Sequence, residues 1–183
     1  MRDLIKKEEY LIVLDFLPMG KATDKRAEPT VQGIGESYFM LLEVVIKKGI
    51  QPKPKDRIYI GSGKREEVEY IKRRITYEDL TSFAKNILEE VVSEIVEKNE
   101  KRFVNFFNTS GPITTRMHSL ELLPGLGKKH LFNILQERKR KPFESFEDIK
   151  NRIEMLPDPK KMIVKRILQE IQNKEERHKL FVA

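Results

Sequence analysis

Residues 120–131 of the chain read LELLPGLGKKHL, and this stretch decides how the C-terminal part folds. Its leucines end at a Pro-Gly pair, which stops a helix, and the residues after Gly127 begin a new one. Glycines at positions 125 and 127 permit a sharp turn and expose bare backbone, because they carry no side chain. The stretch therefore predicts two helical segments joined by a tight turn.

The same turn has the chemistry of an anion site. The first amides of a helix lack intrahelical partners and lie at the positive end of its dipole, where a phosphate binds favourably. Gly125, Leu126 and Gly127 would bring backbone to such a phosphate, and Lys128 and Lys129 would add positive charge. Lysine in a first turn opposes the dipole, so a bound phosphate would compensate for it. A helical turn without a ligand and a protein-protein contact are the alternatives.

The turn resembles the helix-hairpin-helix motif of repair nucleases, ligases and polymerases. The match includes an apolar residue between two glycines and Leu131, the hydrophobe four positions after the second glycine. Residues 156–164 repeat the outline of residues 123–131. Asp158 and Lys160 replace the glycines in this second copy, so we expect it to pack in a paired four-helix unit rather than to bind phosphate.

Basic residues flank the first copy on both sides. Arg116 precedes it and Arg138 lies in the helix that follows, and both are candidates for phosphate contacts. Arg138 begins a basic run, residues 138–141, which equally suits the negative end of that helix's dipole. Between the two copies, Ser145 is expected to cap a short connecting helix, with Asp148 in the capping-box position.

The N-terminal part of the sequence predicts strands. Runs of Val, Ile, Leu and aromatic residues, separated by turn-forming residues, indicate strands at 10–17, 38–47, 57–60 and 68–75. At least four strands in about 75 residues suggest a small OB-like β-barrel. The polar segment 18–35, between the first two strands, is interpreted as a long loop.

A long helix is expected after the strands. Apolar residues recur at intervals of three and four from Leu80 to Val96, which predicts about 20 residues of helix with Thr76 as its cap. Phenylalanines at 103, 106 and 107 continue the spacing, and the sequence NTSGP at 108–112 breaks it. The predicted fold is α+β in three parts, which are an OB-like β-barrel (1–76), linking helices (77–110) and an all-α paired helix-hairpin-helix domain (111–183).

Composition limits the classes of function. The 183 residues carry a net charge of +7, with basic ends and an acidic middle, which suits a polyanionic partner. Without cysteine and with only three histidines, the chain is not expected to hold a structural metal, and we predict no cofactor. The N-terminus lacks a signal-peptide pattern and no apolar run reaches membrane-spanning length, so we expect a cytoplasmic protein with no membrane partner.

Two segments that could suggest catalysis have simpler interpretations. The sequence GSGK at 61–64 differs from a P-loop, because its spacing is too short and Arg65 follows it. We interpret it as a basic turn at the barrel rim, in which Lys64 and Arg65 either contact a nucleic-acid backbone or are only solvated. His118 is expected to pack or lie at the surface, because no nucleophile or carboxylate cluster accompanies it. We therefore expect a protein that is not an enzyme.

Several segments together resemble an archaeal family of uncharacterised proteins. These segments are residues 59–65 (YIGSGKR), 79–81 (DLT), 102–108 (RFVNFFN), 112–118 (PITTRMH) and 122–129 (LLPGLGKK). The resemblance implies an OB-like barrel joined to paired helix-hairpin-helix motifs, an archaeal cytoplasmic setting, and a nucleic-acid-binding role that favours RNA. It transfers no established activity.

The sequence therefore predicts a monomeric protein that binds RNA or DNA through the phosphate backbone without reading the base sequence. The predicted contact residues are Lys64, Arg65, Arg116, Gly125, Leu126, Gly127, Lys128, Lys129 and Arg138. The alternative is a protein-interaction adaptor of the transcription or translation machinery. Such an adaptor would use the acidic helix and the paired hairpins to dock on its partner.

Overall fold

A computed structural model describes residues 6–183, which form two compact units. The first unit comprises the described residues up to Val91 together with Glu170–Ala183, and the second unit is Val92–Gln169. Residues 1–5, on which the interpretation of the N-terminus partly rests, lie outside the described residues. Each unit is described by itself.

The unit boundaries fall inside helices and not at residues 108–112, where the composition breaks. They divide α1 (Ser82–Lys98) and α5 (Pro159–Gln172). The C-terminal segment belongs to the first unit. It forms a hydrogen bond with a loop that joins two strands of this unit. There, the amide of Ala183 donates to the carbonyl of Tyr38 at 3.1 Å.

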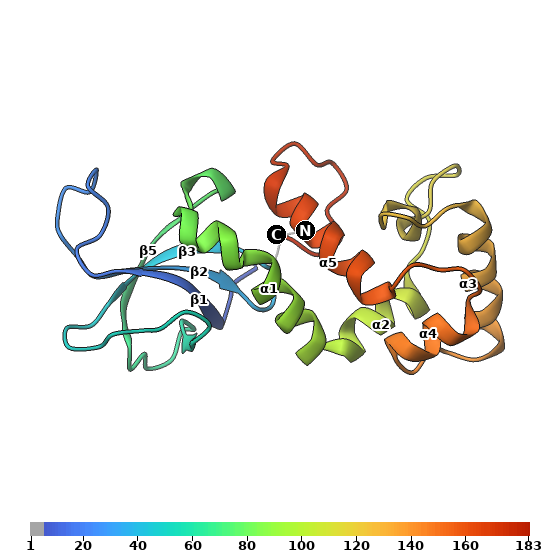
Figure 1. Ribbon diagram of the computed structural model, residues 1–183, viewed down its shortest axis with the longest axis horizontal. Helices are drawn as coiled ribbons and strands as arrows, with labels where there is room; N and C mark the ends of the chain where they lie inside the picture. The colour runs from blue at the N-terminus through green and yellow to red at the C-terminus, as the bar shows by residue number, and fades with distance from the viewer. Residues whose placement is uncertain (1–5) are drawn as a thin grey trace. The chain divides into compact units, whose positions relative to one another are not determined.

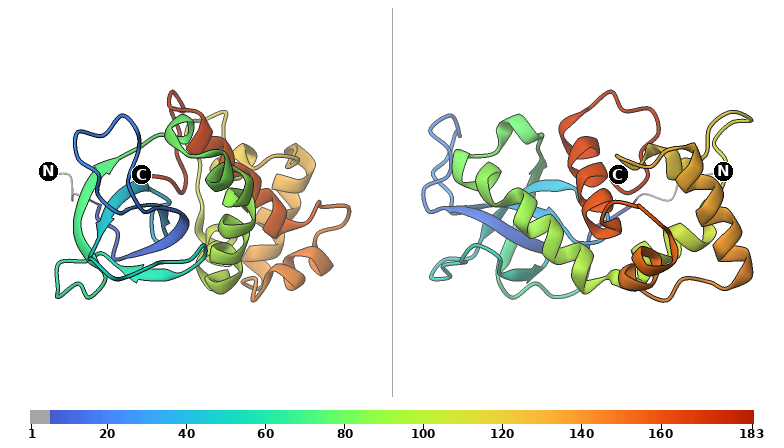
Figure 2. Two further views of the ribbon diagram at one scale, coloured as in Figure 1. Left: turned by 60° about the vertical axis from the view of Figure 1, so that its left-hand side comes forward. Right: turned by 45° about the vertical axis from the view of Figure 1, so that its right-hand side comes forward.

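The first unit is built on five antiparallel strands that curl into a half-barrel (Figure 1; Figure 2, left). The strands are β1 (Tyr10–Leu17), β2 (Thr30–Gly35), β3 (Leu41–Ile46), β4 (Arg57–Tyr59) and β5 (Val68–Arg74). Their order in the sheet is β4-β1-β2-β3-β5. The strands predicted at 10–17, 38–47, 57–60 and 68–75 correspond to β1, β3, β4 and β5.

The strand β2 corrects the interpretation of residues 18–35 as one long loop. It is buried along its whole length and pairs with both β1 and β3. Its sequence, TVQGIG, conceals this role because glycines stand where a central strand usually carries β-branched residues. At Gly33 a Cβ atom would lie 2.5 Å from Cγ of Leu11, so the close approach of β1 requires glycine there.

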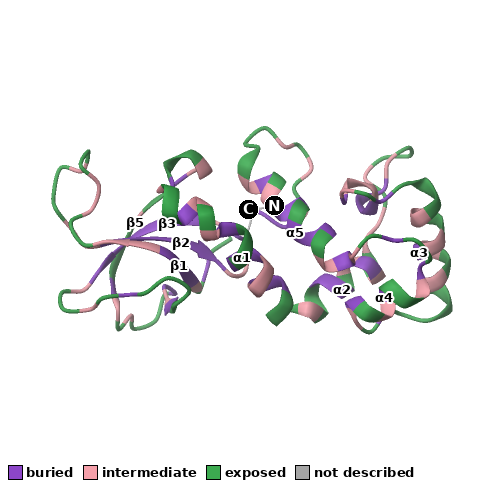
Figure 3. Ribbon diagram, viewed as in Figure 1, coloured by how far each residue is buried: buried purple, intermediate pink, exposed green. Residues whose placement is uncertain are grey.

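Alternate residues of the strands fill the interior of the half-barrel, and β2 and β3 have the colour of buried residues in Figure 3. The interior residues are Leu11, Val13, Val31, Leu42, Val44, Ile46, Ile58, Ile60 and Val68. Burial of each such side chain stabilises the fold by roughly 1.5–3 kcal/mol before the cost of ordering the chain. This core fixes the positions of the turns between the strands.

A buried polar pair on the sheet anchors Lys21. Nε2 of Gln32 donates to Glu43 at 2.9 Å, and the carboxylate of Glu43 also pairs with Lys21 at 2.9 Å and with Arg73 at 2.7 Å. Burial alone would raise the pKa of Glu43, but the bonds from Gln32 and Lys21 outweigh it and lower that pKa. The loop before β2 is thereby tied to the sheet.

The long helix begins later than the sequence predicted. Thr76 caps only a short 3-10 turn, η1 (Tyr77–Asp79), in which its amide donates to Asp79 at 2.9 Å. The helix α1 starts at Ser82, because the hydroxyl of Thr81 accepts from the amide of Ala84 at 3.1 Å. The chain then continues as α2 (Glu100–Thr109), which contains the predicted phenylalanine spacing.

The second unit consists of helices and the turns that join them. After α2 come η2 (Ser119–Leu122), α3 (Lys128–Arg140), α4 (Phe146–Arg152) and the greater part of α5. Ser145 caps α4 as predicted, because its hydroxyl accepts from the amide of Asp148 at 2.9 Å. The carboxylate of Asp148 accepts from the amide of Glu144 at 3.0 Å and not from that of Ser145, which corrects its predicted place in a capping box. Within residues 6–183, no helix is long and apolar enough to cross a membrane.

Candidate functional site

The turn that precedes α3 requires glycine at its centre. Gly125 has a φ angle of +87°, which L-residues with a side chain adopt only with strain. Leu126 is buried, and its amide closes the turn by donating to the carbonyl of Leu123 at 3.2 Å. The segment before the turn is the short 3-10 helix η2 rather than an α-helix. The turn is therefore closed by its own backbone, and Gly127, which follows it, is exposed.

The N-terminus of α3 has no side-chain cap. Gly127 occupies the N-cap position, and no atom lies within 4 Å of the place where its Cβ would be. Within residues 6–183, no hydrogen bond engages the amides of Lys128, Lys129 and His130, the first three of the helix. Unpaired amides at the positive end of a helix dipole attract an anion. The position can therefore receive a phosphate or carboxylate oxygen.

The N-terminus of α5 shows the opposite arrangement. Asp158 is next to the first residue of α5, and its carboxylate accepts from the amides of Lys160 at 3.0 Å and Lys161 at 3.4 Å. This carboxylate stands where an external anion would bind. A Cβ on Gly125 would lie 3.3 Å from Cγ of Pro157, so the two turns are neighbours. One turn thus contains its own anion, and the adjacent one does not.

The two predicted lysines differ in their surroundings. Lys128 forms an ion pair with Glu121, whose carboxylate also accepts from the amide of His118 at 2.7 Å. This amide bond and the nearby Lys128 lower the pKa of Glu121, which keeps it ionised. Lys129 is exposed and forms no ion pair with any residue between 6 and 183. Lys129 is therefore an uncompensated cation in the first turn of α3, beside the free amides.

Arg116 lies near this helix end, in a loop closed by the bridge between Pro112 and His118. Its side chain is exposed, and its carbonyl accepts from Nζ of Lys128 at 3.4 Å. This bond places the backbone of Arg116 beside Lys128 at the start of α3, and the expected contacts of these residues with a phosphate stay predictions.

Arg138 does not belong to this group. Its guanidinium donates to the carbonyls of Ser110 at 2.8 Å and Phe107 at 3.3 Å, at the C-terminal end of α2. Burial lowers the pKa of this guanidinium. Arg138 therefore holds two helices together by satisfying carbonyls that have no intrahelical donor. One nitrogen of the Arg138 guanidinium, Nη1, is thus engaged within the protein, and the contact to nucleic acid expected of Arg138 stays a prediction.

The rest of the basic run at 138–141 is mostly paired within the protein. Arg140 pairs with Glu137 at 2.8 Å, and Lys141 pairs with Glu144 at 3.5 Å. Lys139 is exposed, and the described part of the chain supplies it with no ion pair. Of this run, Lys139 is the cation that remains available to a ligand.

Lys64 and Arg65 lie in the turn between β4 and β5 of the first unit. Nε of Arg65 donates to the carbonyl of Gly61 at 2.8 Å, and its own carbonyl accepts from Nζ of Lys47 at 2.6 Å. Arg65 therefore closes the turn. Lys64 is exposed at the tip of the turn.

His118 has a structural role, and its protonation should destabilise the fold. It is buried, and Nδ1 accepts from the amide of Leu120 at 3.1 Å. Burial lowers the pKa of His118 below 6.5, and the positive charge of Arg138 lowers it further. The unfolded chain then binds the proton more readily, so the stability that neutral His118 contributes is present above pH 6.5 and is lost as the pH falls through the folded-state pKa.

We expect the variant His118→Asn to lose less stability than the wild type between about pH 7 and pH 5. Asparagine keeps an acceptor for the amide of Leu120 but does not titrate in this range. Urea unfolding at a series of pH values measures the effect, and His130 and His178 are common to both proteins. Identical pH dependence in the two proteins would show that His118 is not the titrating group.

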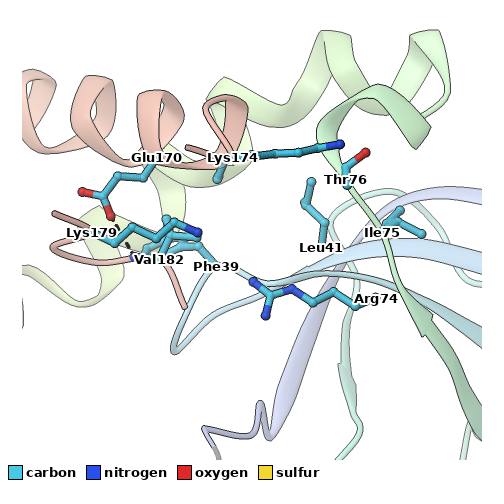
Figure 4. Close-up of a pocket in the computed structure, with 10 residues that line it drawn as sticks. Phe39, Leu41, Arg74, Ile75, Thr76, Glu170, Lys174, Lys179 and Val182 are labelled. Atoms are coloured by element: carbon cyan, nitrogen blue, oxygen red, sulfur yellow. Dashed lines mark hydrogen bonds between the residues drawn. The ribbon is translucent and has the colours of Figure 1, made fainter. Parts of the chain in front are cut away.

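A pocket in the first unit was not indicated by the sequence (Figure 4). Its floor is apolar, its rim carries Arg74, Lys174 and Lys179, and its volume is about 160 Å³. Arg74 already donates to the carbonyl of Ala183, so part of this positive charge is used by the C-terminal segment. The pocket brings residues far apart in sequence together, and no local pattern marks such an arrangement.

These features define a mixed α+β protein, in which a half-barrel of five antiparallel strands is combined with a helical unit that carries an uncapped helix N-terminus. The chain belongs to the family described as "Protein of unknown function (DUF655)", whose model matches residues 7–183.

Two archaeal relatives support this assignment. Uncharacterized protein MJ0038 of Methanocaldococcus jannaschii is 47% identical over 178 residues, which cover 97% of this chain and 81% of the relative. The crystal structure of Af1531 from Archaeoglobus fulgidus, described as a member of the same family, is 53% identical to this chain. It matches with a TM-score of 0.87 and covers 96% of this chain and 100% of that one. The fold described above is thus similar to one determined by crystallography.

Proposed function

We propose that this protein binds nucleic acid through backbone phosphates, without reading the base sequence, and that RNA is its favoured ligand. The binding site lies at the N-terminus of α3 and consists of the amides of Lys128, Lys129 and His130, with Arg116 and Lys129 as free cations. The protein acts as a non-catalytic binder in this proposal. Phosphate contacts position a nucleic acid but carry no sequence information.

The observation that carries this proposal is the contrast between the two neighbouring turns. Asp158 supplies a carboxylate to the first amides of α5, whereas Gly127 leaves those of α3 without a partner. A helix start that faces solvent, lacks a cap and is followed by two lysines loses stability unless an anion binds there. The net charge of +7 favours a polyanion over a small free anion.

The finer fold assignments belong to the same proposal. A strand order of β4-β1-β2-β3-β5 supports an OB-like half-barrel, because OB-folds are partly open five-stranded barrels. The proximity of Gly125 to Pro157 supports paired helix-hairpin-helix motifs, since it places the two turns side by side. Lys64, exposed at the tip of the β4–β5 turn, would give the half-barrel a separate backbone contact.

Salt-dependent binding tests the proposal. Fluorescence anisotropy with single- and double-stranded RNA and DNA of unrelated sequences should give affinities that fall steeply and linearly with salt on logarithmic axes. The variant Lys129→Gln should weaken binding to every sequence and reduce the steepness by about one unit of slope. Lys165→Gln is the matched control, because Lys165 is an exposed lysine of α5 in the same unit.

The outcome also separates this proposal from a protein-interaction adaptor. No binding at low salt, or binding that salt does not weaken, would contradict phosphate recognition. Equal effects of the Lys129 and Lys165 variants would move the contact away from α3. An absence of binding at low salt, or binding that salt does not weaken, would favour an adaptor that docks on a protein of the transcription or translation machinery.

A further inference from the structure

The exposed surface of α3 carries an aromatic ring that the packing of the helix does not use. Phe132 is 59% exposed, whereas Ile134 of the same helix is fully buried and holds α3 to its unit. A single exposed hydrophobic residue is ordinary on a protein surface. The position of Phe132 suggests a ligand contact, because positively charged side chains lie on either side of it along the helix.

Cations flank Phe132 along one face of the helix. Lys129 lies three positions before it and Lys139 seven positions after it, so all three project from the same side of α3. Both lysines are exposed, and the part of the chain that the structure describes provides no ion pair for either. The distance along the helix axis from Lys129 to Lys139 is about 15 Å. This corresponds to about four stacked nucleotides.

We propose that α3 binds a single strand of nucleic acid lengthwise, with an unpaired base stacked on Phe132 and phosphates on Lys129 and Lys139. This inference rests on the proposed function, since the strand enters at the free amides of the α3 N-terminus. An aromatic face accepts every base, so stacking is compatible with binding that ignores sequence. A duplex keeps the faces of its bases covered, so Phe132 gives the protein a preference for single strands.

The charge on this face argues for a nucleic acid and against a protein partner. An apolar contact between proteins is usually depleted of lysine around its centre. Here the aromatic ring lies between two unpaired lysines, and the lysines match a ligand that alternates flat apolar rings with negative groups. A single-stranded nucleic acid has this chemistry along its whole length.

An alanine substitution at Phe132, with a matched control at Phe83, tests the inference. Phe132→Ala should lower the affinity for a single-stranded oligonucleotide about ten-fold and leave the affinity for the matching duplex unchanged. Phe83→Ala, which removes another exposed phenylalanine, is the control and should change neither affinity. Equal loss for single strand and duplex, or no loss for either, would overturn the stacking role.

A spectroscopic readout follows from the absence of tryptophan in the chain. The variant Phe132→Trp introduces a single indole, whose fluorescence should be quenched when a base stacks on it. An oligonucleotide that lacks bases should bind through its phosphates but produce much weaker quenching. Equal quenching by both oligonucleotides, or none by either while they bind, would contradict stacking.

The two proposals can fail separately. If the wild type binds no nucleic acid at low salt, the proposed function fails and the stacking role fails with it. If the wild type binds and Lys129→Gln weakens binding, but Phe132→Ala leaves the single-strand affinity unchanged, only the stacking role is wrong.

Discussion

The variant Gly127→Asp should bind nucleic acid about ten- to a hundred-fold more weakly than the wild type and yet be slightly more stable. The new carboxylate would accept from the first amides of α3, as the carboxylate of Asp158 does in α5. It would thereby occupy the proposed phosphate position and repel an approaching phosphate. The cap should raise the free energy of unfolding by roughly 0.5 kcal/mol.

The local geometry makes this substitution a clean test. Gly127 has a φ of −96°, which any residue adopts, and its Cβ position is free of neighbours. Gly127→Asn introduces a similar cap without the charge and should also weaken binding, though less than aspartate does. Gly127→Ala leaves the amides free and should bind almost as the wild type does. Anisotropy and urea unfolding on the same samples give both quantities.

Two outcomes would contradict a phosphate site at the N-terminus of α3 that depends on free amides. If Gly127→Asp is as stable as expected but binds with wild-type affinity, the amides of α3 do not hold a phosphate. If aspartate, asparagine and alanine all weaken binding equally, the glycine matters for close backbone approach and not for free amides.

The variant Glu170→Ala should lower the free energy of unfolding by about 3 kcal/mol, because it leaves buried amides without an acceptor. The carboxylate of Glu170 is almost fully buried and accepts from the amides of Leu180 and Phe181 at 2.9 Å each and of Val182 at 3.0 Å. Figure 4 shows this carboxylate turned toward the C-terminal segment. Without this carboxylate, the amides of the C-terminal segment either stay buried without an acceptor, which lowers the stability, or the segment separates from the sheet.

Urea unfolding measures the loss, and hydrogen exchange of the amides at 180–182 shows whether the segment separates. Glu175→Ala removes the same charge from an exposed position and should leave both quantities unchanged. Glu170→Gln keeps one acceptor oxygen and should fall between the alanine variant and the wild type. Wild-type stability and unchanged protection in Glu170→Ala would show that these bonds contribute nothing.

Secondary structure followed from the sequence where local chemistry decides it. The strand β1 runs from Tyr10 to Leu17 as predicted, because its residues are apolar apart from Asp15 and a proline follows it. The capping role of Ser145 was predictable because a cap and its partner amide are three positions apart. Membership of an archaeal family of uncharacterised proteins was predicted from the motifs and is confirmed.

Features that depend on distant partners were not predictable. β2 was missed because its glycines are required by the neighbouring strand β1, which only the folded structure places beside it. Thr76 and Thr81 are both acceptable caps, and the bond between Thr81 and Asp15, at 2.6 Å, is invisible in the sequence. The start of α1 was therefore placed too early.

In the candidate site too, local features were predictable from the sequence, and contacts with distant residues were not. Sequence spacing identified the glycine turn and Lys129, because the free amides and the charge are local to the turn. It assigned Arg138 to the ligand because it could not show the carbonyls of α2 that this guanidinium binds. It also overlooked Phe132, since a phenylalanine in an amphipathic helix is usually part of the core. Binding to nucleic acid and the helix-hairpin-helix assignment remain predictions.

The most direct measurement is a titration of the ¹⁵N-labelled protein with a single-stranded oligonucleotide, followed by amide chemical shifts. The proposed site predicts the largest changes at the amides of Lys128, Lys129 and His130, where phosphate oxygens would bind. It predicts small changes at the amides of Lys160 and Lys161, which Asp158 already caps. Binding that leaves the three α3 amides unmoved, or no binding at low salt, would contradict the claim that this helix end holds a phosphate.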